Sequence, residues 1–163
     1  MKIALRVAAS LAILISLTAC ASSKAGKPGP AAPYTFRHKD FDLRYAWNTS
    51  QTDQGIRIDG IVKSVRYASM DDLEVNVALL DKDRKVIGQG STFVAPPALK
   101  IDDLRGFNLL IKDAKLSPGD MLQFVVDYKA TESYNGVNWH GGFTVNAMTG
   151  APIGVGRSPE EEW

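Results

Sequence analysis

Apolar and polar residues alternate in short segments between residues 41 and 147, with turn-forming residues between the segments. Alternation with a period of two is typical of β-strands that bury one face. The clearest segment is residues 73–80, which runs into a charged turn at residues 81–85. The inward positions that this pattern predicts are Phe41, Leu43, Tyr45, Trp47, Leu73, Val75, Val77, Leu79, Phe107, Leu109, Ile111, Leu122, Phe124, Val126, Tyr128, Phe143, Val145 and Ala147.

The spacing of these segments predicts an all-β protein. About seven short strands follow one another, and no segment keeps a helical period over a useful length. We therefore expect a single antiparallel, Ig-like β-sandwich over residues 41–147, without the cysteine pair that joins the sheets of antibody domains. Within it, the apolar phase slips between Ile58 and Ile61, which predicts a β-bulge at Gly60.

A β-hairpin is expected around the charged turn 81–85. The return segment runs from Val86 to Phe93, and its two glycines, Gly88 and Gly90, favour a bend or a place at the edge of a sheet. Asp81 and Asp83 begin like a calcium loop, but the other oxygen ligands of such a loop are missing from the sequence. A polar hairpin tip explains the two aspartates better.

Residues 1–19 have the parts of an export signal. Lys2 and Arg6 precede an apolar run that is shorter than the roughly 20 residues of a membrane-spanning helix. The run ends in Leu17-Thr18-Ala19-Cys20, which resembles the lipobox of bacterial lipoproteins. The resemblance implies cleavage before Cys20 and a lipidated cysteine as the new first residue. The alternative is an ordinary secretory signal with an incidental cysteine.

The lipobox resemblance also implies a location and a layout. A lipidated Cys20 would tether the chain to a membrane of the bacterial cell envelope. Ala21 replaces the aspartate of inner-membrane lipoproteins, which favours the periplasmic face of the outer membrane in a Gram-negative organism. Residues 20–40 are rich in small residues, glycine and proline, as expected of a flexible linker, and we expect the tail 148–163 to be disordered.

The charge balance and the cysteine content limit which partners the chain could bind and what could stabilise its fold. Cleavage before Cys20 would remove two of the 19 basic residues, leaving 17 against 18 acidic residues and a net charge of −1. This balance gives no support for nucleic-acid binding, which usually needs a basic face. A single cysteine excludes an intramolecular disulfide, so the core alone must stabilise the domain.

Two segments of the predicted sandwich carry a second resemblance. Residues 77–90 (VALLDKDRKVIGQG) and 116–130 (LSPGDMLQFVVDYKA) are similar to FxLYD-type and related Ig-like domains of bacterial lipoproteins and surface proteins. In those domains a strand ends in aspartate and a charged turn, and a later Pro-Gly turn opens a strand that carries an aromatic residue. The resemblance implies a non-enzymatic module and transfers no catalytic residue.

The sequence offers no pattern for catalysis or for metal binding. His38 and His140 are the only histidines and lie far apart, whereas a zinc site usually needs three or four Cys or His ligands. Neighbouring aspartates, as in Asp71-Asp72 and Asp102-Asp103, point to opposite faces of a strand and make no acid–base pair. We therefore expect no catalytic residue, no metal site and no cofactor.

The candidate binding surface is formed by Tyr134, Asn138, Trp139 and His140. We expect residues 131–138 to be a polar loop in which aromatic and amide side chains gather. Such side chains give a large contact area at low entropic cost, which suits recognition of a peptide or a glycan. In the alternative interpretation, Trp139 packs over the end of the sandwich and has a structural role.

These observations together predict a membrane-tethered, non-enzymatic binding or structural module whose expected partner is a protein of the cell envelope. The alternative is an accessory subunit or an enzyme with a ligand pocket near Trp139 and His140. A deep pocket that joins His140 with two or more carboxylates would favour that alternative.

Overall fold

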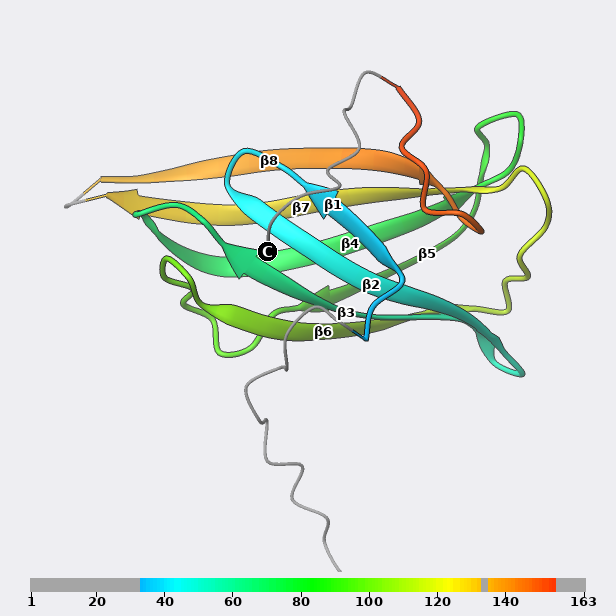
Figure 1. Cartoon of the computed structure of the whole chain (residues 1–163), viewed down its shortest axis with the longest axis horizontal. Coiled ribbons are helices and arrows are strands. Elements are labelled where there is room, and N and C mark those ends of the chain that lie inside the picture. Colours follow the sequence, from blue (N-terminus) through cyan, green and yellow to red (C-terminus); the bar gives the residue numbers. More distant parts are fainter. Residues whose placement is uncertain (1–32, 133–134, 155–163) are drawn as a thin grey trace, which may run out of the picture.

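The structure is a computed structural model that describes residues 33–132 and 135–154. Eight strands form two antiparallel four-stranded sheets that pack face to face, which confirms the predicted all-β sandwich (Figure 1). The strands are β1 (Phe36–Lys39), β2 (Leu43–Thr52), β3 (Gly55–Ser64), β4 (Ser69–Leu80), β5 (Val86–Phe93), β6 (Leu104–Lys112), β7 (Met121–Glu132) and β8 (Asn135–Asn146). Within the described ranges, no helix is long and apolar enough to cross a membrane.

The strand order is that of an immunoglobulin-like sandwich. One sheet, here called sheet A, has the order β1-β2-β3-β6, and the other, sheet B, has the order β5-β4-β7-β8. The strands β2, β3 and β6 correspond to A, B and E of immunoglobulin domains, and β5, β4, β7 and β8 correspond to C′, C, F and G. The short strand β1 is an addition beside β2, and it lies within the predicted linker. The sandwich therefore begins before residue 41.

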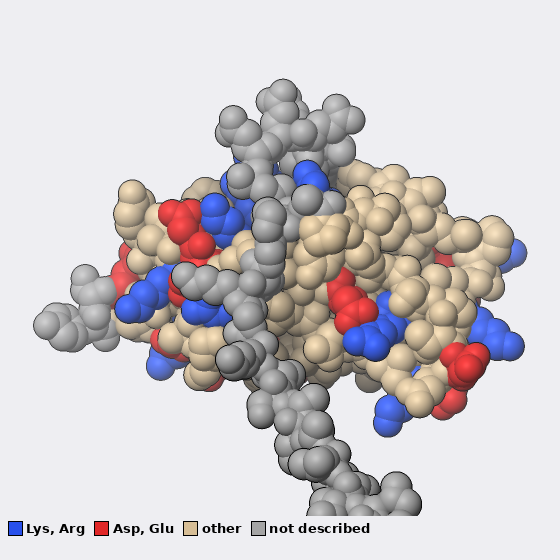
Figure 2. Space-filling view, turned by 60° about the horizontal axis from the view of Figure 1, so that its bottom comes forward, with Lys and Arg blue, Asp and Glu red and all other residues tan. Residues whose placement is uncertain are grey.

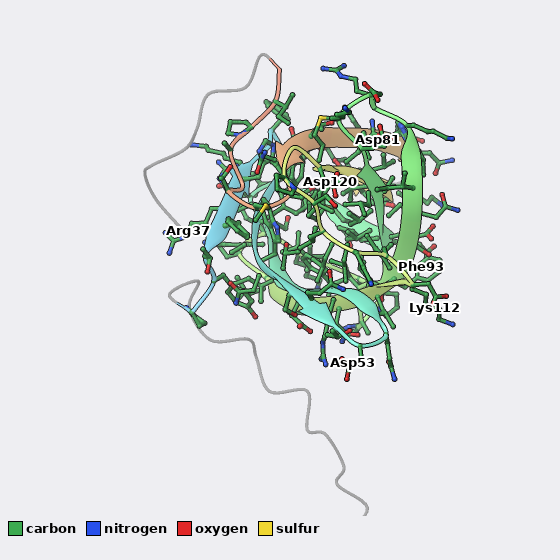
Figure 3. All side chains as sticks on the ribbon, turned by 90° about the vertical axis from the view of Figure 1, so that its right-hand side faces the viewer. Arg37, Asp53, Asp81, Phe93, Lys112 and Asp120 are labelled. Carbon is green, nitrogen blue, oxygen red and sulfur yellow. The ribbon has the colours of Figure 1, made fainter. Side chains whose placement is uncertain are left out.

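The two sheets enclose a core with an aromatic centre. Trp47 of β2 and Phe124 of β7 are fully buried, and their ring centroids lie 4.9 Å apart. Phe143 of β8 stacks on Phe124 at 4.7 Å and is partly buried. All other predicted inward residues except Phe41 are buried. In the end-on view of Figure 3, side chains fill the space between the sheets.

The inward prediction is wrong for Phe41, whose side chain is 82% exposed. The N–H of Asp40 donates to the carbonyl of Leu43 (2.9 Å), which closes a tight turn between β1 and β2. Strand β2 therefore begins only at Leu43, and the alternation that reaches back to Phe41 in the sequence crosses a turn in the structure.

The predicted bulge at Gly60 is also wrong. The pairing of β3 with β2 and with β6 continues through Gly60 without a shift of register. Ile61 instead faces the outer side of sheet A, where it is buried and where Tyr34 and Leu104 pack against its cluster. Gly60 serves close packing, because a Cβ at this position would lie only 2.5 Å from the ring of Phe107.

The hairpin of β4 and β5 has the predicted polar tip and edge strand. Oδ1 of Asp81 accepts hydrogen bonds from the N–H groups of Asp83 and Lys85, both at 2.9 Å. Strand β5 is the edge of sheet B, and it approaches β6 of sheet A closely at Gly90. A Cβ at Gly90 would lie 2.8 Å from the carbonyl oxygen of Leu110, so only glycine allows the sandwich to close on this side.

The chain after β8 folds back onto the sandwich. The N–H of Asn146 donates to the carbonyl of Ala151, and the N–H of Ile153 donates to that of Thr144, both at 2.8 Å. The first residues of the predicted disordered tail, up to residue 154, are thus held by hydrogen bonds. The signal segment, Cys20, most of the predicted linker and residues 155–163 lie outside the described residues.

Candidate functional site

The structure places Trp139 in a strand. Strands β7 and β8 pair continuously from Met121 opposite Asn146 to Glu132 opposite Asn135. The predicted polar loop 131–138 is therefore wrong for residues 131–132 and 135–138, which are paired strand residues toward the left of Figure 1. Asparagine and glycine are weak strand formers, and pairing along β7 determines their conformation here.

Trp139 and Val137 lie on the inner face of sheet B but at a place where sheet A no longer covers it. They pair with Tyr128 and Ala130, which both belong to the inward face of β7. The hairpin of β7 and β8 extends past the start of β2 and the end of β3 (Figure 1). Trp139 is consequently 40% exposed and Val137 is 56% exposed, although their phase is that of core residues.

Arg66 lies against this uncovered part of the hairpin. Its guanidinium carbon is 4.9 Å from the ring centroid of Trp139 and 5.9 Å from that of Phe41, both within cation–π range. Its Nη1 donates to both carboxylate oxygens of Asp42, at 3.1 and 3.2 Å, and its Nη2 is 3.2 Å from Glu132 Oε1. Burial acts to lower the pKa of Arg66, but the attraction of Asp42 and Glu132 outweighs burial and raises it.

Asp42 anchors Arg66 from the interior. It is only 6% exposed, and the hydroxyl of Tyr128 donates a hydrogen bond to its Oδ2. Burial, followed by this hydrogen bond to the carboxylate, raises the pKa of Tyr128, so the phenol remains a donor. The network links the turn before β2, the chain after β3 and strand β7, and it holds the guanidinium in one orientation.

Phe41, Arg66, Val137 and Trp139 are called the hairpin patch below. They come from three separate segments: the turn before β2, the chain after β3, and β8. Tyr67, which follows Arg66, is 92% exposed. Sequence analysis identified only Trp139 among the four. Phe41 had the periodicity of a core residue, and Arg66 had no local signal because its carboxylate partners lie far from it in the sequence.

Two other predicted surface residues, Asn138 and His140, lie on the opposite face of the hairpin. His140 pairs with Asp127 and Asn138 pairs with Lys129, at outward positions of β7. The His140 side chain is 73% exposed, and its Nδ1 lies 2.7 Å from Asp127 Oδ1. The structure therefore separates Trp139 from Asn138 and His140, and Tyr134 lies outside the described residues.

The two histidines are not brought together. His38 of β1 stacks on Phe143 with 3.7 Å between ring centroids, whereas His140 is on the outer face of sheet B. Across residues 33–132 and 135–154, no group of three His, Cys, Asp or Glu side chains could hold a metal ion. Within the described residues, Asp127 is the carboxylate that pairs with His140, and this pair lies at an exposed surface.

A hollow of about 460 Å³ lies on the outer face of sheet B between β4, β5 and β7. Neither Trp139 nor His140 lines it, although Asn76 of its lining contacts Asp127, the partner of His140, at 3.5 Å. It is lined by Asn76, Val77, Ala78, Gln89, Gly90, Ser91, Gln123 and Val125. None of these residues is charged. The hydroxyl of Ser91 is the one group among them that serves as a nucleophile in enzymes, and it does so only when a base activates it. No histidine lines the hollow to activate that hydroxyl.

Charges of both signs are interspersed on the face shown in Figure 2. Among the described residues, ion pairs join Arg57 with Asp59 at 2.9 Å and Lys63 with Asp102 at 3.0 Å. Binding to a nucleic-acid backbone depends on a surface that neutralises several phosphates at once, and this face offers no such surface.

No protein-family model and no curated protein matches the chain. Among solved structures, it is similar to the GAE domain of yeast GGA1, with 9% identity, a TM-score of 0.41, and 68% of this chain and 98% of that one covered. It is similar to the GAE domain of GGA2p from Saccharomyces cerevisiae, with 10% identity, a TM-score of 0.40, and coverage of 66% and 94%. A β-glucuronidase of glycoside hydrolase family 2 matches with 11% identity, a TM-score of 0.34, and coverage of 63% and 11%.

Proposed function

We propose that this protein is a lipid-anchored protein of the bacterial cell envelope whose Ig-like sandwich is a non-enzymatic module that binds a protein partner through the hairpin patch. The observation that carries the proposal is the exposure of Trp139, Val137 and Phe41 around an arginine that two carboxylates hold in place.

The composition of the hairpin patch suits protein recognition. Tryptophan and arginine are enriched among residues that dominate interface energies, and aromatic residues are enriched at interface cores. Single exposed apolar residues are ordinary, but a group of them around one point is a feature of interaction sites. Because Asp42 and Glu132 already orient Arg66, a partner would not have to order this side chain on binding.

The tether in this proposal rests on the sequence Leu17-Thr18-Ala19-Cys20 and on the linker that follows it. Cys20→Ser tests it, because a serine cannot receive the thioether-linked lipid. We expect the variant to lose fatty-acid labelling and to accumulate as an uncleaved precursor or as a released form. Intact-mass spectrometry of the wild-type membrane fraction provides the decisive measurement, and an unlipidated mature chain there would rule out the lipid anchor.

Trp139→Ala tests the binding surface. Truncation of an interface aromatic often costs about 2 kcal/mol or more, which is roughly thirtyfold in affinity. We therefore expect Trp139→Ala to lower the yield of crosslinked partner captured from envelope extract. Trp139 is already 40% exposed, so the melting temperature of the domain should change little.

Phe93→Ala is the matched control for this experiment. Phe93 is an exposed aromatic residue of β5, 66% exposed; it pairs with Glu74 at an outward position of sheet B, and β4 and β7 separate its strand from β8. Its truncation should leave capture unchanged. Equal capture by Trp139→Ala and the wild type would remove the hairpin patch as the binding surface. A loss of capture that accompanies a collapsed melting curve would assign Trp139 a structural role instead.

A further inference from the structure

We infer that the partner binds as an extended segment that adds a strand to the free edge of β8, alongside residues 135–142. This inference rests on the proposed function and specifies its binding mode. Main-chain pairing supplies affinity, and contacts with the hairpin patch select the side chains of the added segment. Addition of a strand to an exposed sheet edge is a recurring mode of peptide recognition.

The edge of β8 differs from the other sheet edges of the molecule. Strand β1 has only four residues and carries Arg37 and Lys39, while β5 and β6 lie against each other across the two sheets. Strand β8 has twelve residues, none of them Pro, Lys, Arg, Asp or Glu, and its pairing with β7 has no register shift. Proteins usually protect sheet edges by short length, charge, proline or a bulge, and β8 has none of these protections.

The chain itself shows that this edge accepts an added strand. Val145 forms an antiparallel bridge with Pro152, flanked by the hydrogen bonds of Asn146 with Ala151 and of Ile153 with Thr144. The main-chain groups of Thr144 and Asn146 thus point away from β7. Because this orientation alternates along a strand, those of Asn138, His140 and Gly142 point the same way.

Among the described residues, this pairing extends to Ile153, whose N–H donates to the carbonyl of Thr144. Gly154, the last described residue, has a φ of +109°. Among the described residues, nothing pairs with the β8 edge from Asn135 to Gly142. Within the described ranges, that stretch is thus an unpaired continuation of an edge that residues 151–153 occupy at its other end.

The surroundings of the edge define the chemistry of the added segment. Its inward side chains would lie beside Trp139 and Val137 and face Phe41, so at least one of them should be apolar. Strand β8 itself carries no Lys, Arg, Asp or Glu, and Arg66 already has two carboxylate partners. The carboxylate of Asp40 borders Gly141, with its Oδ2 3.6 Å from the position of a Cβ there, which disfavours an acidic segment. The occupant is thus an uncharged, proline-free extended segment of a partner protein with an apolar residue at the hairpin patch.

Asn138→Pro and Asn138→Ala form a matched pair that tests this inference. Both remove the same side chain, but only proline removes the outward N–H, and β7 pairing does not use that N–H. The probe consists of uncharged peptides selected from a random library against the whole chain in detergent. We expect Asn138→Pro to weaken their binding about tenfold or more, whereas Asn138→Ala should change it by less than about twofold.

Amide hydrogen exchange of the wild-type protein gives a second measurement that does not depend on the folding of a proline variant. Bound peptide should slow exchange at Asn138, His140 and Gly142. Unchanged exchange at these amides, or equal affinities for Asn138→Pro and Asn138→Ala, would overturn the inference.

The experiment also separates the inference from its alternatives. Protection of the three amides before peptide is added would indicate another occupant: residues 155–163 of the chain if protection is independent of protein concentration, and a second copy if it rises with concentration. Binding that is sensitive to Trp139→Ala but not to Asn138→Pro would overturn strand addition and leave the proposed function standing. If neither Trp139→Ala nor Asn138→Pro changes the binding of the selected peptides, both strand addition and the proposed function are overturned.

Discussion

Arg66 has its orientation set by residues that lie far from it in the sequence. Asp42 and Glu132 bind its guanidinium from two sides, while Trp139 and Phe41 flank it with their rings. A lysine could not reproduce this arrangement, because the guanidinium reaches Asp42 through Nη1 and Glu132 through Nε and Nη2, and an ammonium group lacks this planar fork. With two carboxylates close to one cation, the hairpin patch has no spare positive charge, which agrees with an uncharged partner segment.

Gly60 offers a test of how closely a single position in sheet A is packed. In Gly60→Ala, the new Cβ would lie 2.5 Å from the Phe107 ring and 2.7 Å from the Ala46 carbonyl oxygen. Neither neighbour can move without displacing the sheet. We expect a loss of about 1–3 kcal/mol in the free energy of unfolding, measured by chemical denaturation.

Gly106→Ala is the control for this substitution. Gly106 lies in β6 beside Gly60 of β3, but a Cβ there would meet its nearest atom at 3.8 Å, an ordinary contact. Because alanine restricts the unfolded chain more than glycine does, this variant should be neutral or up to about 1 kcal/mol more stable. Equal destabilisation by both substitutions would contradict close packing at Gly60.

Strands whose own residues alternate between apolar and polar could be predicted from the sequence, and strands without such alternation could not. β4 and β7 are central in sheet B, and their inward residues, such as Val77 and Phe124, follow the alternation throughout. The first half of β8 consists of glycine, asparagine, histidine and two apolar residues, so only its pairing with β7 makes it a strand. That pairing is visible in three dimensions and has no signal within the segment itself.

The candidate site, like the strands, was predictable only where the signal lay within one segment. Trp139 could be predicted as a surface residue from its residue type and from the amide residues beside it in the sequence. Its neighbours in space, Phe41 and Arg66, could be found only once the β1–β2 turn, the end of β3 and the β7–β8 hairpin were placed together. The periodicity of Phe41 was misleading, because a tight turn interrupts the strand between Phe41 and Leu43.

The sandwich as a whole is closed differently along its two long sides. Between β5 and β6 the backbones approach each other directly, as Gly90 permits. Between β1 and β8 the side chains make the contact, with His38 of sheet A stacked on Phe143 of sheet B at 3.7 Å. The second side therefore depends on a ring that can gain a proton.

Protonation of His38 should make the stability of the whole domain depend on pH. Burial lowers the pKa of His38 in the folded protein, and the nearby charge of Asp40 offsets part of that effect. In the unfolded chain a histidine titrates near pH ~6.5. As the pH falls below that value, the unfolded state takes up a proton that the folded state resists, so the free energy of unfolding decreases. Above about pH 7 the ring is neutral in both states and contributes no slope.

Two substitutions examine this pH dependence by chemical denaturation between about pH 7 and pH 5. His38→Phe keeps a ring against Phe143 and removes the titrating group, so the decrease in stability toward low pH should become shallower than in the wild type. Asp40→Asn removes the charge that favours the protonated ring and should make the decrease steeper. A slope that survives unchanged in His38→Phe would assign the effect to another group, and the side-chain contact between β1 and β8 would then not be sensitive to pH.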